Sequence, residues 1–146
     1  MTNEIYPLRE KVVMVTGATA GIGEAAARQL YSLGAQVILH GRNPVRCAAM
    51  IDRILQAVPE TPGRLDVFTA DFAVMAQVYE MTEAIRKRYS RLDVLVNNAG
   101  AFFLRRQKTP DGLEKTFAVN YLAHFLLTRQ LLDLLKASVP SRVIHV

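Results

Sequence analysis

The sequence of 146 residues is poor in the side chains that form disulfides and clustered metal sites. Cys47 is the only cysteine, which excludes an intrachain disulfide and a cysteine-based metal site. The three histidines, His40, His124 and His145, show no metal-ligand spacing, so we expect core or surface positions for them and no bound metal. This sparing use of cysteine predicts a reduced, cytoplasmic protein.

Long apolar runs are also missing. The segment Met1–Glu10 is polar and resembles no secretory signal, and no run reaches the roughly 20 apolar residues that a membrane span needs. We therefore expect no membrane span. The formal net charge of +5 suits an anionic partner, either a dinucleotide phosphate or a nucleic acid. No nucleic-acid recognition motif accompanies this charge, so we expect no nucleic-acid partner.

The residues that are present alternate between strand-like apolar runs and helical periodicity, and the length predicts one domain over residues 1–146. The expected strands are Val12–Thr16, Gln36–His40, Leu65–Thr69, Leu92–Val96 and Arg142–Val146. The expected helices are Gly21–Leu33, Pro44–Val58, Asp71–Tyr89 and Asp111–Ser138. This alternation predicts an α/β fold with a doubly wound parallel sheet of strand order 3-2-1-4-5.

Three glycines, Gly17, Gly21 and Gly23, separate the first strand from the first helix. Such a turn lets the backbone approach a pyrophosphate, and the N–H groups and dipole of the helix then hold the anion. The alternative is an ordinary strand-to-helix turn. The helix itself is expected to bury a face made of Ile22, Ala25, Ala26, Leu30 and Leu33.

The string TGATAGIG, which starts at Thr16, resembles the glycine motif of the short-chain dehydrogenase/reductase family. Two further family markers follow, at Asn97–Gly100 and Thr116–Asn120, and the segments 111–114 and 120–125 resemble the retinol-dehydrogenase-like branch. The resemblance runs from about Lys11 to Val146. It implies a Rossmann-type fold and hydride transfer between a nicotinamide cofactor and an alcohol or carbonyl carbon. It also implies a homo-oligomeric parent protein.

The resemblance assigns cofactor binding to the turns that follow the first four strands. The residues concerned are Gly17, Thr19, Ala20, Gly21, Ile22, Gly23, Arg42, Asn43, Asp71, Phe72, Asn97, Ala99 and Gly100. Arg42 favours NADP over NAD, because the second strand ends without a carboxylate that could bind the ribose 2′-hydroxyl. A guanidinium suits the 2′-phosphate of NADP. The alternative for Arg42 is a solvated loop arginine.

Two of the other turns carry assigned roles with open alternatives. Asp71 is expected to bind the adenine amino group, to cap the third helix, or to do both. By resemblance, Asn97 ties neighbouring strands together, while Ala99 and Gly100 let the backbone pass close to a ribose. A plain Asn/Gly turn is the alternative there. The loop residues Arg105, Arg106 and Lys108 are expected to be solvated.

Asn120 is the one catalytic candidate. Its helical spacing from Leu113, Thr116, Leu127 and Leu131 predicts that it points inward, where its amide would need partners. In the family this asparagine marks a helix irregularity whose freed carbonyl holds a water of a proton relay. A purely structural asparagine is the alternative.

The family's catalytic Tyr-x-x-x-Lys pair does not occur, because none of the five tyrosines has a lysine four residues later. The segment Ser141–Val146 resembles the family's fifth strand, whose end carries a catalytic serine. We therefore expect the cofactor-binding half of a longer oxidoreductase, truncated after strand five and inactive alone. The alternative is a non-catalytic dinucleotide-binding or sensor domain.

Overall fold

A computed structural model describes residues 6–146, and its centre is one five-stranded parallel sheet of order β3-β2-β1-β4-β5. The strands are β1 Val12–Val15, β2 Gln36–Gly41, β3 Arg64–Thr69, β4 Val94–Asn97 and β5 Arg142–His145. Each neighbouring pair is parallel, with Val13 of β1 aligned between Val37 of β2 and Val94 of β4. The predicted Rossmann-type α/β fold and its strand order are confirmed.

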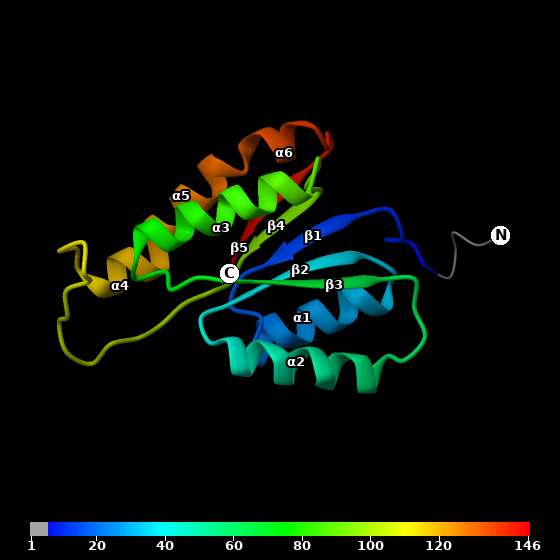
Figure 1. Cartoon of the computed structure of the whole chain (residues 1–146), viewed down its shortest axis with the longest axis horizontal. Coiled ribbons are helices and arrows are strands. Elements are labelled where there is room, and N and C mark those ends of the chain that lie inside the picture. Colours follow the sequence, from blue (N-terminus) through cyan, green and yellow to red (C-terminus); the bar gives the residue numbers. More distant parts are fainter. Residues whose placement is uncertain (1–5) are drawn as a thin grey trace.

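Helices cover both faces of this sheet (Figure 1). One layer contains α1 Gly21–Ser32 and α2 Pro44–Ala57, and the other contains α3 Met75–Arg88, α5 Ala123–Gln130 and α6 Leu132–Lys136. No helix within residues 6–146 is both long enough and apolar enough to span a membrane.

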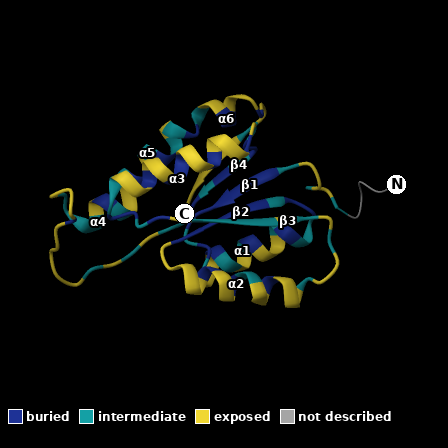
Figure 2. Cartoon of the chain, viewed as in Figure 1, coloured by how far each residue is buried: buried dark blue, intermediate teal, exposed yellow. Residues whose placement is uncertain are grey.

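The unbroken apolar run of β1 follows from this double cover. Val13 and Val15 pack with α1 and α2, whereas Val12 and Met14 pack with α3 and α5, because successive side chains of a strand point to opposite faces. All four are buried, and Figure 2 shows the central strands as the buried layer between mostly exposed outer helix faces.

The buried face of α1 differs from the predicted one. Gly23, Ala27 and Tyr31 are buried, while Ile22, placed on the inner face by its hydrophobicity, is 70% exposed. The true face lies one residue further along the chain, where the small residues Gly23 and Ala27 let the helix approach the sheet closely. Apolar periodicity missed this face because it gave glycine no weight.

The single long helix expected over residues 111–138 is divided in the structure. It begins with a short α4, Lys115–Phe117, because Glu114 accepts hydrogen bonds from the N–H groups of Thr116 and Phe117 and so caps it. A π-helical segment η1, Ala118–Leu122, follows, and α5 is separated from α6 at Leu131.

The third helix also begins later than predicted. Its first residue is Met75, so Asp71 lies outside it and does not cap it. The Met75 N–H instead donates to Asp111 Oδ2 at 2.9 Å, from a loop far along the chain. A capping side chain so distant in sequence leaves no local signal, which explains why the cap was assigned to the nearest aspartate.

Asp93 anchors the amino end of the central strands. Its side chain is 2% exposed and accepts hydrogen bonds from the Val12 N–H at 2.9 Å, from Lys11 at 3.1 Å and from Arg91 at 2.6 Å. Burial by itself would raise the pKa of Asp93, but these donors outweigh it and hold the pKa below its usual value. The ionised carboxylate therefore ties β1 to the start of β4.

Replacement of Asp93 by asparagine is expected to lower the free energy of unfolding by about 1–3 kcal/mol at neutral pH, because charged hydrogen bonds are lost. A lowered pKa stabilises the fold above the unfolded-state pKa and this contribution disappears as pH falls through the folded-state value. The difference should therefore shrink below about pH 4. Urea unfolding followed by circular dichroism at pH 7 and pH 3 measures it.

The matched control is Asp133→Asn. Asp133 is 75% exposed and contacts Arg86 at 3.4 Å, so its loss should change the free energy of unfolding by about 0–1 kcal/mol. Equal losses in the two variants, or a loss in Asp93→Asn that does not depend on pH, would contradict the role given to Asp93.

Candidate functional site

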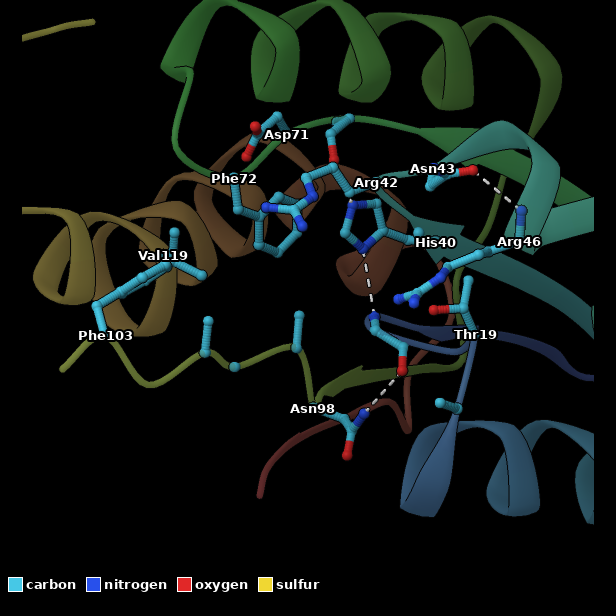
Figure 3. Close-up of a pocket in the computed structure, with 17 residues that line it drawn as sticks. Thr19, His40, Arg42, Asn43, Arg46, Asp71, Phe72, Asn98, Phe103 and Val119 are labelled. Atoms are coloured by element: carbon cyan, nitrogen blue, oxygen red, sulfur yellow. Dashed lines mark hydrogen bonds between the residues drawn. The ribbon is translucent and has the colours of Figure 1, made fainter. Parts of the chain in front are cut away.

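A cavity of about 600 Å³ opens at the carboxyl ends of the strands (Figure 3). This is the edge where ligands bind in doubly wound sheets. Its walls include the predicted residues Gly17, Thr19, Ala20, Arg42, Asn43, Asp71, Phe72, Ala99 and Gly100. Cofactor binding was not predicted from the sequence for the other lining residues, namely His40, Gly41, Arg46, Ala70, Asn98, Ala101, Phe103 and Val119. The predicted residues Gly21, Ile22, Gly23, Asn97 and Asn120 lie outside the lining.

The glycine loop packs directly against the turn after β4. Gly17 has φ +64°, and a Cβ there would lie 2.7 Å from Ala99 Cα. A Cβ on Gly23 would strike the Gly17 carbonyl and the Asn98 amide nitrogen. Both positions thus require glycine because the loop, the helix and the β4 turn are in close contact.

The N-terminus of α1 is left open beside this loop. No side chain of residues 6–146 caps it, whereas Asn43 caps α2 by accepting from the Arg46 N–H at 3.1 Å. The first N–H groups of a helix have no acceptor within the helix, and the helix dipole makes this end attractive to anions. The uncapped end therefore has the chemistry of an anion-binding site.

Arg53 of α2 binds both the glycine loop and the first turn of α1. Its guanidinium makes two hydrogen bonds of 2.8 Å to Glu24 of α1, and it donates to the Thr19 carbonyl at 3.3 Å. The hydrogen bond with Arg53 is the main reason that the pKa of Glu24 lies below its ordinary value. The sequence gives no signal for this contact, which joins residues 29 positions apart.

His40 forms part of the cavity floor. Its Nδ1 accepts from the Gly17 N–H at 3.3 Å and its Nε2 lies 3.1 Å from the Ala70 carbonyl, which assigns the proton to Nε2. The ring stacks on Phe72 with centroids 4.1 Å apart. Burial lowers the pKa of His40 to about 4, against the opposing bond to Ala70, so the ring is neutral near pH 7.

In contrast to the neutral His40 ring, the positively charged side chains lie at the rim of the cavity. Arg42 follows β2 and Arg46 lies in the first turn of α2; both are exposed, and Figure 3 shows both side chains reaching into the cavity. Asp71 accepts from the Ala73 N–H at 2.9 Å, which fixes the loop after β3. Arg46 was not predicted, although its position four residues after Arg42 could have indicated it.

Asn98, not Asn97, ties the ends of the neighbouring strands together. The Asn98 N–H donates to Thr16 Oγ1 and its side-chain amide donates to the Thr16 carbonyl, both at 2.9 Å. Asn97 is 1% exposed and points the other way, donating to Thr128 Oγ1 at 3.2 Å. Because successive side chains alternate along a strand, the two adjacent asparagines serve different partners.

Asn120 is exposed, so its predicted inward orientation is wrong. The expected helix irregularity is present, since Asn120 lies inside η1, whose wider turn shifts the helical spacing on which the inward prediction relied. Its side chain binds Ala101 at both ends, accepting from the N–H at 2.8 Å and donating to the carbonyl at 2.9 Å. Asn120 thereby holds the segment after β4 against η1.

Residues 6–146 contain no group of three or more histidine, cysteine, aspartate or glutamate side chains placed to hold a metal ion.

Comparison with known families agrees with this geometry. Residues 11–146 match the family model described as short chain dehydrogenase. The chain belongs to this family. It is 42% identical over 144 residues to retinol dehydrogenase 14 of Mus musculus, a match that covers 93% of this chain and 43% of that protein. The family and the retinol-dehydrogenase-like branch predicted from the sequence are confirmed, and the chain spans less than half of this relative.

Solved structures show the same architecture. The Pseudomonas aeruginosa RhlG/NADP active-site complex is 32% identical with a TM-score of 0.78, over 97% of this chain and 56% of that one. A metagenomic short-chain oxidoreductase in complex with NADP is 31% identical with a TM-score of 0.80, over 94% of this chain and 62% of that one.

Alanine at Gly23 is expected to lower the free energy of unfolding by about 1–3 kcal/mol, because the new methyl group overpacks the contact with the Gly17 carbonyl. Alanine at Gly17 should cost at least as much, since it adds strain from the positive φ. Denaturant unfolding of each variant measures these losses.

The control for both is Gly100→Ala. The nearest atom to a Cβ there is Asn120 Oδ1 at 3.7 Å, an ordinary contact, so the change should stay within about 0.5 kcal/mol. A Gly23→Ala variant as stable as Gly100→Ala would show that the loop is not held in close contact.

Proposed function

We propose that this chain is the cofactor-binding part of an NADP-dependent oxidoreductase that transfers hydride between the nicotinamide and an alcohol or carbonyl carbon. One observation carries the proposal: the cavity has an uncapped helix N-terminus on one side and two arginines on another. Its volume of about 600 Å³ lies in the range of small-molecule sites. Family membership and the two NADP complexes of similar fold support the same reading.

The hydrogen-bond donors beside the glycine loop fit the pyrophosphate at the centre of a dinucleotide. The backbone N–H groups of the first turn of α1, at Gly21, Ile22 and Gly23, would hold the pyrophosphate. This gives those three residues a role although none of them is among the residues that line the cavity. Thr19 and Ala20 form the adjoining wall.

The nucleoside ends would lie against the neighbouring turns. We place the adenine beside Asp71 and Phe72, where a carboxylate can accept from the adenine amino group. We place a ribose against Ala99 and Gly100, where a methyl group and a bare glycine leave the backbone open to a ligand.

The preference for NADP rests on charge at the end of β2. His40, Gly41, Arg42 and Asn43 include no carboxylate that could bind a free ribose 2′-hydroxyl. Arg42 and Arg46 both reach the cavity at this end, and guanidinium groups pair well with a phosphate. A second arginine strengthens the argument that Arg42 alone gave.

When bound, the nicotinamide would supply or accept the hydride. The residues of this chain bind and orient it. The Tyr-x-x-x-Lys pair that the family resemblance associates with proton transfer does not occur among the 146 residues, so we expect no turnover by this chain alone. A cytoplasmic location and a homo-oligomeric parent stay predictions from the sequence.

NADPH is expected to bind the chain more tightly than NADH by about 1–3 kcal/mol, which is the scale of hydrogen bonds to charged groups. Arg42→Asp should abolish or reverse this preference, because it replaces a phosphate partner by a carboxylate. Titrations that follow the fluorescence of the reduced nicotinamide measure both affinities, and the chain contains no tryptophan to interfere.

Arg64→Asp is the matched control, since it changes the net charge equally. Arg64 is exposed at the start of β3, at the opposite end of the sheet, so the variant should keep the preference for NADPH. Equal affinity of the unsubstituted chain for both cofactors would show that Arg42 does not select NADP through its 2′-phosphate. Failure to bind either cofactor would overturn the proposed function.

A further inference from the structure

Three segments of the chain meet at the buried imidazole of His124. This residue belongs to α5, is 6% exposed and does not line the cavity. Its Nδ1 lies 3.2 Å from the main-chain carbonyl oxygen of Asn120, inside η1. Its Nε2 lies 3.4 Å from Thr16 Oγ1, at the end of β1. One ring thus bridges the π-helical segment and the strand that leads into the glycine loop.

The protons around Thr16 decide the tautomer of this ring. Thr16 Oγ1 accepts from the N–H groups of Asn98 and Ala99, both at 2.9 Å, which occupies its two lone pairs. The hydroxyl proton can go either to the Val96 carbonyl at 3.3 Å or to His124 Nε2. The Val96 carbonyl already accepts from the Thr16 N–H at 3.0 Å, and it shares the Asn98 N–H with Thr16 Oγ1. Nε2 is therefore the acceptor that still lacks a donor.

A neutral ring with its proton on Nδ1 satisfies every partner. Nε2 accepts from Thr16, and Nδ1–H donates to the Asn120 carbonyl. A second proton would point Nε2–H at a hydroxyl oxygen whose lone pairs are already occupied. Burial also lowers the pKa of His124, against the opposing bond to Asn120.

The same contacts close a ring of hydrogen bonds. Asn120 binds the backbone of Ala101 through its side chain, and Ala99 binds Thr16, so the segment from Ala99 to Ala101 is held at both ends. His124 joins Thr16 to Asn120 and so closes this ring of hydrogen bonds. Ala99, Gly100 and Ala101 all line the cavity. The shape of that wall therefore depends on a histidine that lies outside it.

We propose that His124 is a positioning residue that, as the neutral Nδ1–H tautomer, fixes the cavity wall at Ala99–Ala101 by linking the Thr16 hydroxyl to the Asn120 carbonyl. Its effect on the cofactor rests on the proposed function above. Its effect on the wall does not, because the hydrogen bonds belong to the chain itself. The two effects can be measured separately.

The first measurement needs no cofactor. Long-range ¹H–¹⁵N spectra of the unsubstituted chain at pH 7 should show Nδ1 of His124 protonated and Nε2 unprotonated. In His124→Phe, which keeps an aromatic ring beside Phe72 but removes both bonds, the amides of Ala99 and Ala101 should exchange with solvent about tenfold faster or more. The amide of Leu39, in the core under α1 and α2, should keep its protection.

The second measurement uses NADPH. His124→Phe should weaken its binding about tenfold or more, since the wall that meets the ligand loses its fixed position. His124→Asn should recover part of the loss, because its short amide can still donate to the Asn120 carbonyl. His145→Phe is the matched control: His145 is exposed at the end of β5, so this variant should bind NADPH like the unsubstituted chain.

The outcomes separate the two proposals. Suppose that the unsubstituted chain binds no NADPH, yet His124 shows the expected tautomer and His124→Phe the expected amide exchange. This result would refute the proposed NADP-binding function and leave the role of His124 in the cavity wall intact. A proton on Nε2 would overturn the inference, as would unchanged exchange at Ala101 in His124→Phe. If His124→Phe does not fold, the tautomer and the His124→Asn variant decide the same question.

Discussion

The contact between the glycine loop and the turn after β4 is the constraint on which the rest of the site depends. The Thr16 hydroxyl accepts the N–H groups of Asn98 and Ala99, and Gly17 presses against the Ala99 backbone with no room for a side chain. Parallel strands bring their carboxyl ends to the same edge, so β1 and β4 can make this contact only as neighbours. The cavity wall, the open end of α1 and the ring of hydrogen bonds through His124 all start from it.

The polar groups beneath the cavity are kept neutral, while the charges stay at its rim. The His40 ring stacks on the Phe72 ring and the His124 ring meets it edge-on, and burial lowers the pKa of both histidines. A buried cation there would cost several kcal/mol without a paired anion. Neutral imidazoles can still order the backbone through hydrogen bonds. Arg42 and Arg46 are exposed at the rim of the cavity.

Local patterns in the sequence predicted the strands and the family, because each depends on neighbouring residues. The strand order followed from the doubly wound template. The features that were missed depend on partners far along the chain. Asp111 caps α3 from 36 residues away, which local reading assigned to Asp71. The inward orientation given to Asn120 assumed regular helical spacing, and η1 removes that assumption. The choice of Asn98 over Asn97 depended on where each side chain points at the end of β4, toward Thr16 for Asn98 and toward Thr128 for Asn97, which the motif alone does not state.

The β1–β4 pair is fixed at both ends by opposite kinds of chemistry. At the amino end, the buried Asp93 carboxylate is paired with Lys11 and Arg91, so charge supplies stability there. At the carboxyl end, the Thr16 hydroxyl and the Asn98 amide make neutral hydrogen bonds, and the first N–H groups of α1 have no side-chain acceptor. An ion pair at the carboxyl end would compete with an incoming phosphate for those groups. Charged pairing therefore stabilises the amino edge of the sheet, while the carboxyl edge leaves the first N–H groups of α1 without a side-chain acceptor.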